Sequence, residues 1–225
     1  MSITLAFDVY GTLIDVGGLV HELGYVAGEN AEGFGSLWRE KQLEYSFRRG
    51  LMQSYENFSI CTRQALDYAC LQYQLDLTTK QKDQLLDFYS RLPLFDDVLE
   101  GLDSLQEQGV KLYAFSNGSV QAVDDLLSHA GIRNRFLEII SADEIKTFKP
   151  NPAVYDHFLK RSNASKTHAW VVSSNPFDVI GAISAGLNGA WIKRSNGQIF
   201  DPWGVEPTMT LKSLVDIQGQ LIVAD

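Results

Sequence analysis

The sequence predicts an α/β protein: a Rossmann-like parallel sheet with helices on both faces and an inserted all-helical cap domain. From residue 95 onward, apolar runs alternate with helical patterns at intervals of roughly 20 to 30 residues, which is typical of a parallel sheet with right-handed crossovers. Residues 15–94 follow the first apolar run and carry only helical periodicity. We therefore expect a core domain of residues 1–14 and 95–225, interrupted by a cap domain of residues 15–94.

Composition limits the class of protein. The chain has 225 residues, of which 45% are hydrophobic, and a net charge of −9. This acidity argues against nucleic acid as a partner, because nucleic acids attract basic surfaces, but a few local cations could still bind a small anion. No apolar run approaches the roughly 18 residues of a membrane span. Cys61 and Cys70 are badly spaced for a disulfide on one helix, so we expect free thiols and a cytoplasmic protein.

The first element, Ile3–Phe7, is a short apolar run that predicts a buried strand. The segment FDVYGTL ends this strand with Asp8. Gly11 permits a tight turn, and Thr12 places a hydroxyl near the acid. Open α/β sheets bind ligands at the carboxyl ends of their strands, which makes Asp8 a candidate functional residue. The alternative is an Asp that only forms a turn or caps a helix.

The segment after Leu13 is expected to be helical throughout. Apolar and charged residues interleave with helical spacing, most clearly around Trp38, and Thr78 or Thr79 is a suitable N-cap. The expected helices cover residues 16–29, 34–51, 55–73 and 80–92.

The remaining elements alternate between helix and strand. Gly109 and Gly131 each follow a helix as C-cap residues, while Asn151–Pro152 and Asn175–Pro176 each open one. The segment NGQIFDPWGVEP, which begins at Asn196, is expected to be a loop without assignable chemistry. The expected helices are 98–108, 119–130, 152–161 and 176–186, and the expected strands are 110–115, 136–140, 169–172 and 190–193.

Loops at the carboxyl ends of the strands carry the candidate chemistry. Besides the Asp8 loop, they are Ser116–Ser119 (SNGS), Phe148–Pro152 (FKPNP) and Ser173–Asp178 (SSNPFD). A hydroxyl with the backbone N–H groups of a helix N-terminus can bind an anion, and Pro150 favours an extended backbone before it. Each loop taken alone could hold only helix caps or a solvated lysine. Their occurrence at successive strand ends favours a shared site.

With these loops in order, the chain resembles the haloacid dehalogenase superfamily over essentially its whole length. That family has an Asp nucleophile after the first strand, a Ser or Thr after the second, a Lys before a later helix and an acidic loop after the fourth. The segments FDVYGTL, LWREKQLEYS, SNGS, FKP followed by VY, and SSNPFD resemble type II L-2-haloacid dehalogenases. The resemblance implies hydrolysis of short L-2-haloacids to D-2-hydroxy acids without metal or other cofactor, with the haloacid and halide as small-molecule partners.

The resemblance also implies roles for single residues. Asp8 would attack C2 of the substrate with inversion and form an ester, which water then cleaves. Lys149 would keep Asp8 ionised, and Arg39 with Asn175 would receive the halide. The implied catalytic residues are Asp8, Thr12, Arg39, Ser116, Lys149, Tyr155, Ser173, Asn175 and Asp178. The implied substrate-binding residues are Val9, Tyr10, Arg39, Leu43, Phe58, Ser116, Asn117, Lys149, Asn175 and Phe177.

Other functions stay open at this point. Phosphatases of the superfamily carry a second Asp two residues after the nucleophile, where this chain has Tyr10, and an acidic cluster for magnesium, where this chain has only Asp178. A halide leaves as a stable anion and needs neither that acid nor that metal, so the losses favour dehalogenation. A magnesium-dependent phosphatase and a non-catalytic anion-binding relative remain the alternatives.

Two positions depart from the pattern of the family. Glu40 follows Arg39 where relatives carry a neutral Gln, and its carboxylate would repel a halide unless it points away or is paired. Phe177 replaces a Trp. These two residues are expected to affect the rate of the reaction and the preferred chain length of the substrate, and not the class of reaction. The resemblance further implies a homodimer formed through the long helices of the cap domain.

Overall fold

The computed structural model describes residues 3–221, and its centre is a parallel sheet. In the described chain the sheet has six strands in the order β3-β2-β1-β4-β5-β6, and each neighbouring pair is parallel. The predicted parallel sheet is therefore confirmed. The strands are β1 (Thr4–Asp8), β2 (Lys111–Ser116), β3 (Glu138–Ser141), β4 (Ala169–Ser173), β5 (Asn188–Ile192) and β6 (Met209–Leu211).

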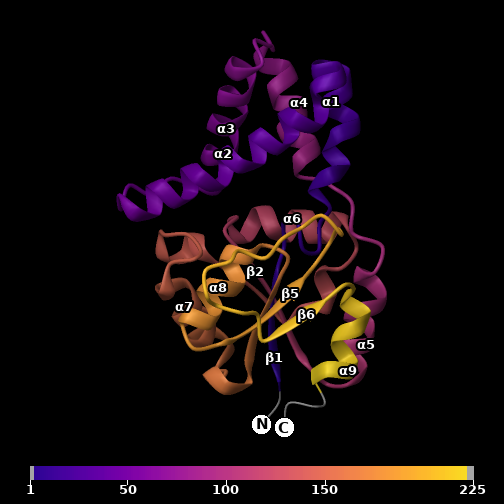
Figure 1. Ribbon diagram of the computed structural model, residues 1–225, viewed down its shortest axis with the longest axis vertical. Helices are drawn as coiled ribbons and strands as arrows, with labels where there is room; N and C mark the ends of the chain where they lie inside the picture. The colour runs from indigo at the N-terminus through magenta and orange to yellow at the C-terminus, as the bar shows by residue number, and fades with distance from the viewer. Residues whose placement is uncertain (1–2, 222–225) are drawn as a thin grey trace.

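Helices cover both faces of this sheet (Figure 1). Side chains of a strand alternate between its faces, so Leu5 and Phe7 enter one hydrophobic core while Ala6 enters another. The first core is covered by α5 (Val98–Glu107), α6 (Val120–His129) and α9 (Ile217–Leu221). The second core is covered by α7 (Pro152–Ser162) and α8 (Pro176–Ser184).

The segment between β1 and α5 forms a separate helical layer beyond the carboxyl ends of the strands (Figure 1). Where the chain enters and leaves this layer, Ile14 pairs with Leu94, and the Asp15 N–H donates to the Pro93 carbonyl at 2.8 Å. Thr78 caps the last of these helices and forms a capping box with Gln81. The helices are α1 (Leu19–Ala27), α2 (Ala31–Leu51), α3 (Phe58–Gln72) and α4 (Thr79–Tyr89).

The structure corrects two of the predicted elements. The helix expected over residues 16–29 is divided: a 3-10 turn at Val16–Gly18 precedes α1, and Gly28, at φ +55°, ends it. The positive φ of Gly28 is a conformation that favours glycine and that a continuous helix does not use. The prediction also ended the sheet at 190–193 and missed β6, because three residues are too few for a recognisable alternation.

Within residues 3–221, no helix is long and apolar enough to cross a bilayer. Both cysteines, Cys61 and Cys70, are free and buried. Burial raises the pKa of both thiols, so neither behaves as a reactive thiolate.

Candidate active site

The Asp8 carboxylate lies at the carboxyl end of the central strand β1 and is nearly buried. Its Oδ2 accepts hydrogen bonds from Thr12 Oγ1 at 2.8 Å, Asn175 Nδ2 at 2.7 Å and Ser173 Oγ at 3.3 Å. Its Oδ1 accepts from Lys149 Nζ at 3.1 Å. Donors from three separate loops thus fix the orientation of one carboxylate.

The turn after Asp8 is tied to the loop after β4. Gly11 has φ +84°, a conformation that favours glycine, and its N–H donates to the Ile14 carbonyl at 2.8 Å. Ser174 donates its N–H to Thr12 Oγ1 at 2.9 Å and its hydroxyl to the Gly11 carbonyl at 2.5 Å. The Thr12 hydroxyl therefore accepts a hydrogen bond from the Ser174 N–H and donates one to the Asp8 carboxylate.

Lys149 is buried between two carboxylates. Its Nζ donates to Asp8 Oδ1 at 3.1 Å, to Asp178 Oδ2 at 2.8 Å and to the Phe115 carbonyl at 2.8 Å. Burial alone lowers the pKa of Lys149, but attraction to Asp178 and Asp8 outweighs it, and the pKa is raised. The three donors of the ammonium group are all used within the site.

Asp178 lies in the first turn of α8 and is completely buried. It accepts from Lys149 Nζ and, at Oδ1, from the hydroxyl of Tyr155 at 3.0 Å. Burial raises the pKa of the Asp178 carboxyl, and Lys149 opposes that shift. Burial also raises the pKa of Tyr155, so its hydroxyl stays a donor. Asp178 therefore does not only occupy the first turn of a helix, because it is also hydrogen-bonded within the site.

Arg39 and Asn175 meet at the backbone of Tyr10. The Asn175 side chain occupies the N-cap position of α8 without capping it, and its Nδ2 bonds Asp8 and, at 3.2 Å, the Tyr10 carbonyl. Arg39 comes from α2 and donates NH2 to the same carbonyl at 3.3 Å. In the described chain no carboxylate lies within 4.0 Å of the Arg39 guanidinium, so it is not the surface ion pair that its position on a helix would allow.

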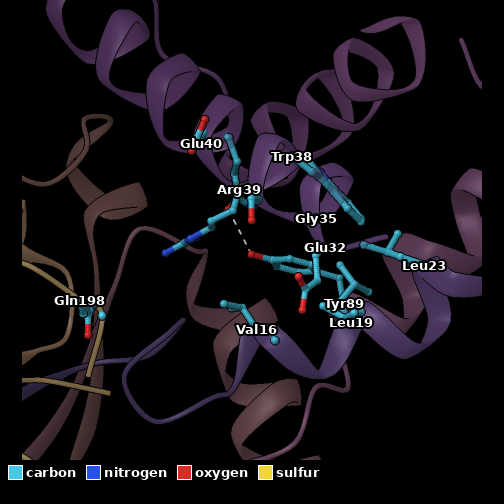
Figure 2. A pocket seen from close by; sticks show the side chains of 15 residues that line it. Val16, Leu19, Leu23, Glu32, Gly35, Trp38, Arg39, Glu40, Tyr89 and Gln198 are labelled. Carbon is cyan, nitrogen blue, oxygen red and sulfur yellow. Dashed lines mark hydrogen bonds between the residues drawn. The ribbon is translucent and has the colours of Figure 1, made fainter. Parts of the chain in front are cut away.

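Glu40 does not face this guanidinium. Figure 2 shows its carboxylate directed away from the Arg39 guanidinium and from Tyr89, and the residue is exposed. Glu40 nevertheless lines the same cleft as Arg39.

Aromatic rings surround the backbone where Arg39 and Asn175 meet. The ring of Tyr10 stacks on Tyr89, with centroids 5.5 Å apart, and lies 6.3 Å from Phe58. Burial raises the pKa of the Tyr10 phenol, which stays neutral. These rings form an apolar wall beside the Asp8 turn.

The other expected binding residues occupy different surroundings. Leu43 is half-buried one turn of α2 after Arg39, and Phe177 packs its ring against Phe47 at 5.0 Å. The Val9 side chain is fully buried in the first core, which leaves only its backbone for a ligand. The Asn117 Oδ1 accepts the Lys149 N–H at 2.9 Å, so this side chain holds the lysine loop.

Ser116 ends β2 and is buried, and its Oγ accepts the Gly118 N–H at 3.1 Å. Ser119 caps α6 by accepting the Ala122 N–H at 3.3 Å. The loop therefore ends at a helix N-terminus, where N–H groups favour an anion.

Sequence reasoning missed several residues of the site. Gln42 accepts from Arg39 NH1 at 2.6 Å and from the Tyr89 hydroxyl at 3.1 Å, and it donates to Thr62. The spacing of Arg39 and Gln42 was a signal, because residues three apart share one face of a helix. It was not a specific signal, because many other pairs on α2 have the same spacing.

Two clefts flank this part of the molecule. One, with a volume of about 910 Å³, lies between α1, α2 and the loop at Gln198, and Arg39 lines it (Figure 2). The other, of about 430 Å³, is lined by Tyr10, Phe58, Gly118 and Ser119. Both extend to Tyr89. Arg39 lines the first cleft and Tyr10 the second, so the two clefts lie on either side of these neighbours of Asp8, while Asp8 itself lines neither.

Residues 3–221 contain no group of three or more His, Cys, Asp or Glu side chains that could hold a metal ion. The paired carboxylates of Asp8 and Asp178 instead share the Lys149 ammonium.

A carboxylate on the central strand, a buried lysine and this sheet order define a known class of enzyme. Residues 4–186 match the family model of the haloacid dehalogenase-like hydrolases, and the chain belongs to this family.

Two curated relatives and one solved structure to which the chain is similar are named as dehalogenases. The chain is 37% identical to an (S)-2-haloacid dehalogenase of Pseudomonas sp. (strain YL), over 93% of this chain and 90% of the relative. It is 36% identical to haloacetate dehalogenase H-2 of Moraxella sp. (strain B), over 92% of each chain. A solved L-2-haloacid dehalogenase from Xanthobacter autotrophicus with chloropropionic acid covalently bound is 27% identical, with a TM-score of 0.90 and 99% of each chain covered.

Proposed function

We propose that this protein hydrolyses short L-2-haloacids to D-2-hydroxy acids through an ester on Asp8, without a metal. One observation carries the proposal: the Asp8 carboxylate, bonded by Lys149, also accepts from Asn175, and Asn175 shares the Tyr10 carbonyl with Arg39. A nucleophile next to donors for a leaving anion is the arrangement that displacement of a halide requires. The names of the relatives agree with it.

In the first step, an Asp8 oxygen forms a bond to C2 while the carbon–halogen bond breaks and the halide leaves with its electron pair. Attack from the side opposite the halogen inverts C2. Arg39 and Asn175 stabilise the halide, which needs no proton. Ser116 and the N–H groups that follow it bind the substrate carboxylate at the N-terminal end of α6.

In the second step, water attacks the carbonyl carbon of the Asp8 ester. Asp178 accepts a proton from that water, and its raised pKa strengthens it as a base. When the tetrahedral species collapses, the bond between the Asp8 carbonyl carbon and the C2 oxygen breaks, and that oxygen takes the proton from Asp178. The D-2-hydroxy acid leaves, and loss of the second water proton to solvent restores the Asp8 carboxylate. Tyr155 and Lys149 hold Asp178 in place throughout.

The expected roles of the other residues are part of the proposal. Thr12 orients Asp8, and Ser173, which also bonds Asp8, joins Asp178 and Lys149 in positioning the water. Tyr10, Phe58, Leu43 and Phe177 select the alkyl group, with residues 15–94 acting as a cap domain over the core of 1–14 and 95–225. The packing of Tyr10 between Tyr89 and Phe58 supports an apolar wall at this place.

We also propose that the protein is a cytoplasmic homodimer. Two free, buried cysteines suit a reducing compartment. Leu51 and Met52, at the end of α2, are 85% and 66% exposed, which suits an interface formed by that helix. Light scattering on purified protein tests the dimer, and a monomer at micromolar concentration would exclude it.

Halide release from L- and D-2-chloropropionate, measured separately with EDTA present, tests the function. Release from the L isomer alone is expected. Release from neither isomer, together with magnesium-dependent hydrolysis of a phosphate ester, would overturn the proposal in favour of a phosphatase.

A further inference from the structure

The side chain of Gln42 is completely buried at the junction between α2, α3 and α4. Its Oε1 accepts from Arg39 NH1 at 2.6 Å and from the Tyr89 hydroxyl at 3.1 Å. Figure 2 shows Arg39 and Tyr89 on the wall of one cleft, with the hydroxyl of Tyr89 directed toward α2.

The other side of the amide is fixed as well. Gln42 Nε2 donates to Thr62 Oγ1 at 2.6 Å, and that hydroxyl donates to the Phe58 carbonyl at 2.9 Å. Because Oε1 faces two donors and Nε2 faces an acceptor, only one orientation of the amide satisfies all four groups. The direction of its Oε1 is therefore set by α3 and α4.

The amide oxygen of Gln42 is a neutral acceptor, and so is the backbone carbonyl to which Arg39 also donates. NH1 bonds the Gln42 amide and NH2 bonds the Tyr10 carbonyl. A carboxylate partner would orient the guanidinium equally well, but it would also cancel the charge that attracts an anion. Two neutral acceptors orient the cation and leave its charge available.

We propose that Gln42 is a positioning residue that directs Arg39 toward the departing halide and, by being uncharged, preserves the halide affinity of Arg39. The inference rests on the proposed function. Tyr89 and Thr62 act through Gln42, since they hold its amide in the orientation that bonds Arg39.

The test compares Gln42→Glu with Gln42→Met. The first variant keeps the shape and the acceptor but adds a charge, and the second removes the hydrogen bonds without adding one. The matched control is Gln64→Glu, because Gln64 also accepts from an arginine, Arg49, at 3.0 Å, but does so on an exposed surface away from Asp8. For each protein, kcat, KM, inhibition by bromide and Tm are measured with L-2-chloropropionate.

We expect Gln42→Glu to lose kcat by at least about tenfold and to need at least about tenfold more bromide for inhibition, because the charge of the half-buried Arg39 guanidinium is neutralised. Gln42→Met should lose kcat severalfold and keep more of its bromide inhibition. Gln64→Glu should stay within about twofold of the wild type. Wild-type kcat and bromide inhibition in Gln42→Glu would overturn the inference, and so would equal losses in both Gln42 variants.

Two further readouts separate the inference from the function. If the wild type releases no halide, the proposed function is wrong. If the wild type is active and Gln42→Glu has the same kcat and bromide inhibition, only the role of Gln42 is wrong. The rise in Tm caused by bromide, relative to sulfate at matched ionic strength, needs no turnover. It should be present in the wild type and Gln64→Glu and absent in Gln42→Glu, and a rise of equal size in all three would overturn the inference.

Discussion

Arg39 and Asn175 donate to the same backbone oxygen, the carbonyl of Tyr10, at 3.3 and 3.2 Å. Arg39 belongs to α2, in the helical layer, and Asn175 to the loop after β4, in the sheet layer. The site is therefore assembled across two layers, and a single carbonyl marks the place where their N–H groups converge beside Asp8. In the proposed reaction, Arg39 and Asn175 receive the halide at this place.

Replacing Asp8 with Asn should abolish steady-state halide release, by at least about 1,000-fold, because an amide of the same shape is not a nucleophile. Halide release under saturating substrate measures this, and Tm confirms that the variant is folded. Turnover at the wild-type rate would rule out Asp8 as the attacking group.

Replacing Asn175 with Asp should reduce kcat by about 100-fold, since it exchanges a donor for a like charge beside the Asp8 carboxylate. Asn134→Asp is the control, because Asn134 is an exposed residue outside the site. If both variants kept the activity of the wild type, donation by Asn175 would have no part in the reaction.

Replacing Tyr155 with Phe should slow hydrolysis of the ester more than its formation. The change removes the hydroxyl that bonds Asp178 and leaves the contacts of Asp8 intact. Rapid mixing should then show a burst of halide followed by a steady rate about 10-fold below that of the wild type, with ester-modified enzyme visible by mass spectrometry. Equal slowing of burst and steady state would contradict the assignment.

The stability of the protein should fall at alkaline pH through Lys149. The folded state raises the pKa of this residue, so its contribution to stability is complete below the unfolded value of about 10.4 and is lost as pH rises through the folded value. Tm measured from pH 8 to 11 should fall more steeply in the wild type than in Lys149→Met. Lys160→Met, at an exposed position, should follow the wild type, and parallel curves for all three would refute the claim.

Much of the site was predictable from the sequence because parallel strands bring their carboxyl ends together. The placement of Asp8, Ser173 and Asn175 in adjacent loops follows from strand order alone, and Lys149 joins them from the loop before α7. Asp8 and Ser173 end their strands, Asn175 comes two residues after β4, and Lys149 directly precedes Pro150. Strand ends and prolines are signals that sequence shows well.

The partners of Arg39 were less predictable. Gln42, three residues after Arg39, shares its face of α2, whereas Glu40 does not. That Gln42 is buried and bonded to Thr62 and Tyr89 depends on how α2 packs against α3 and α4, which spacing within one helix does not report. β6 was missed for a different reason: its three residues pair with β5 in the tertiary structure and carry little pattern of their own.

The most direct test of the account is a single turnover in oxygen-18 water with enzyme in excess over L-2-chloropropionate. If water attacks the carbonyl carbon of an Asp8 ester, the label enters the Asp8 carboxylate, and a peptide containing Asp8 gains mass while the lactate stays unlabelled. Label found only in the lactate would show that water attacks C2 directly, and the ester mechanism on Asp8 would be wrong.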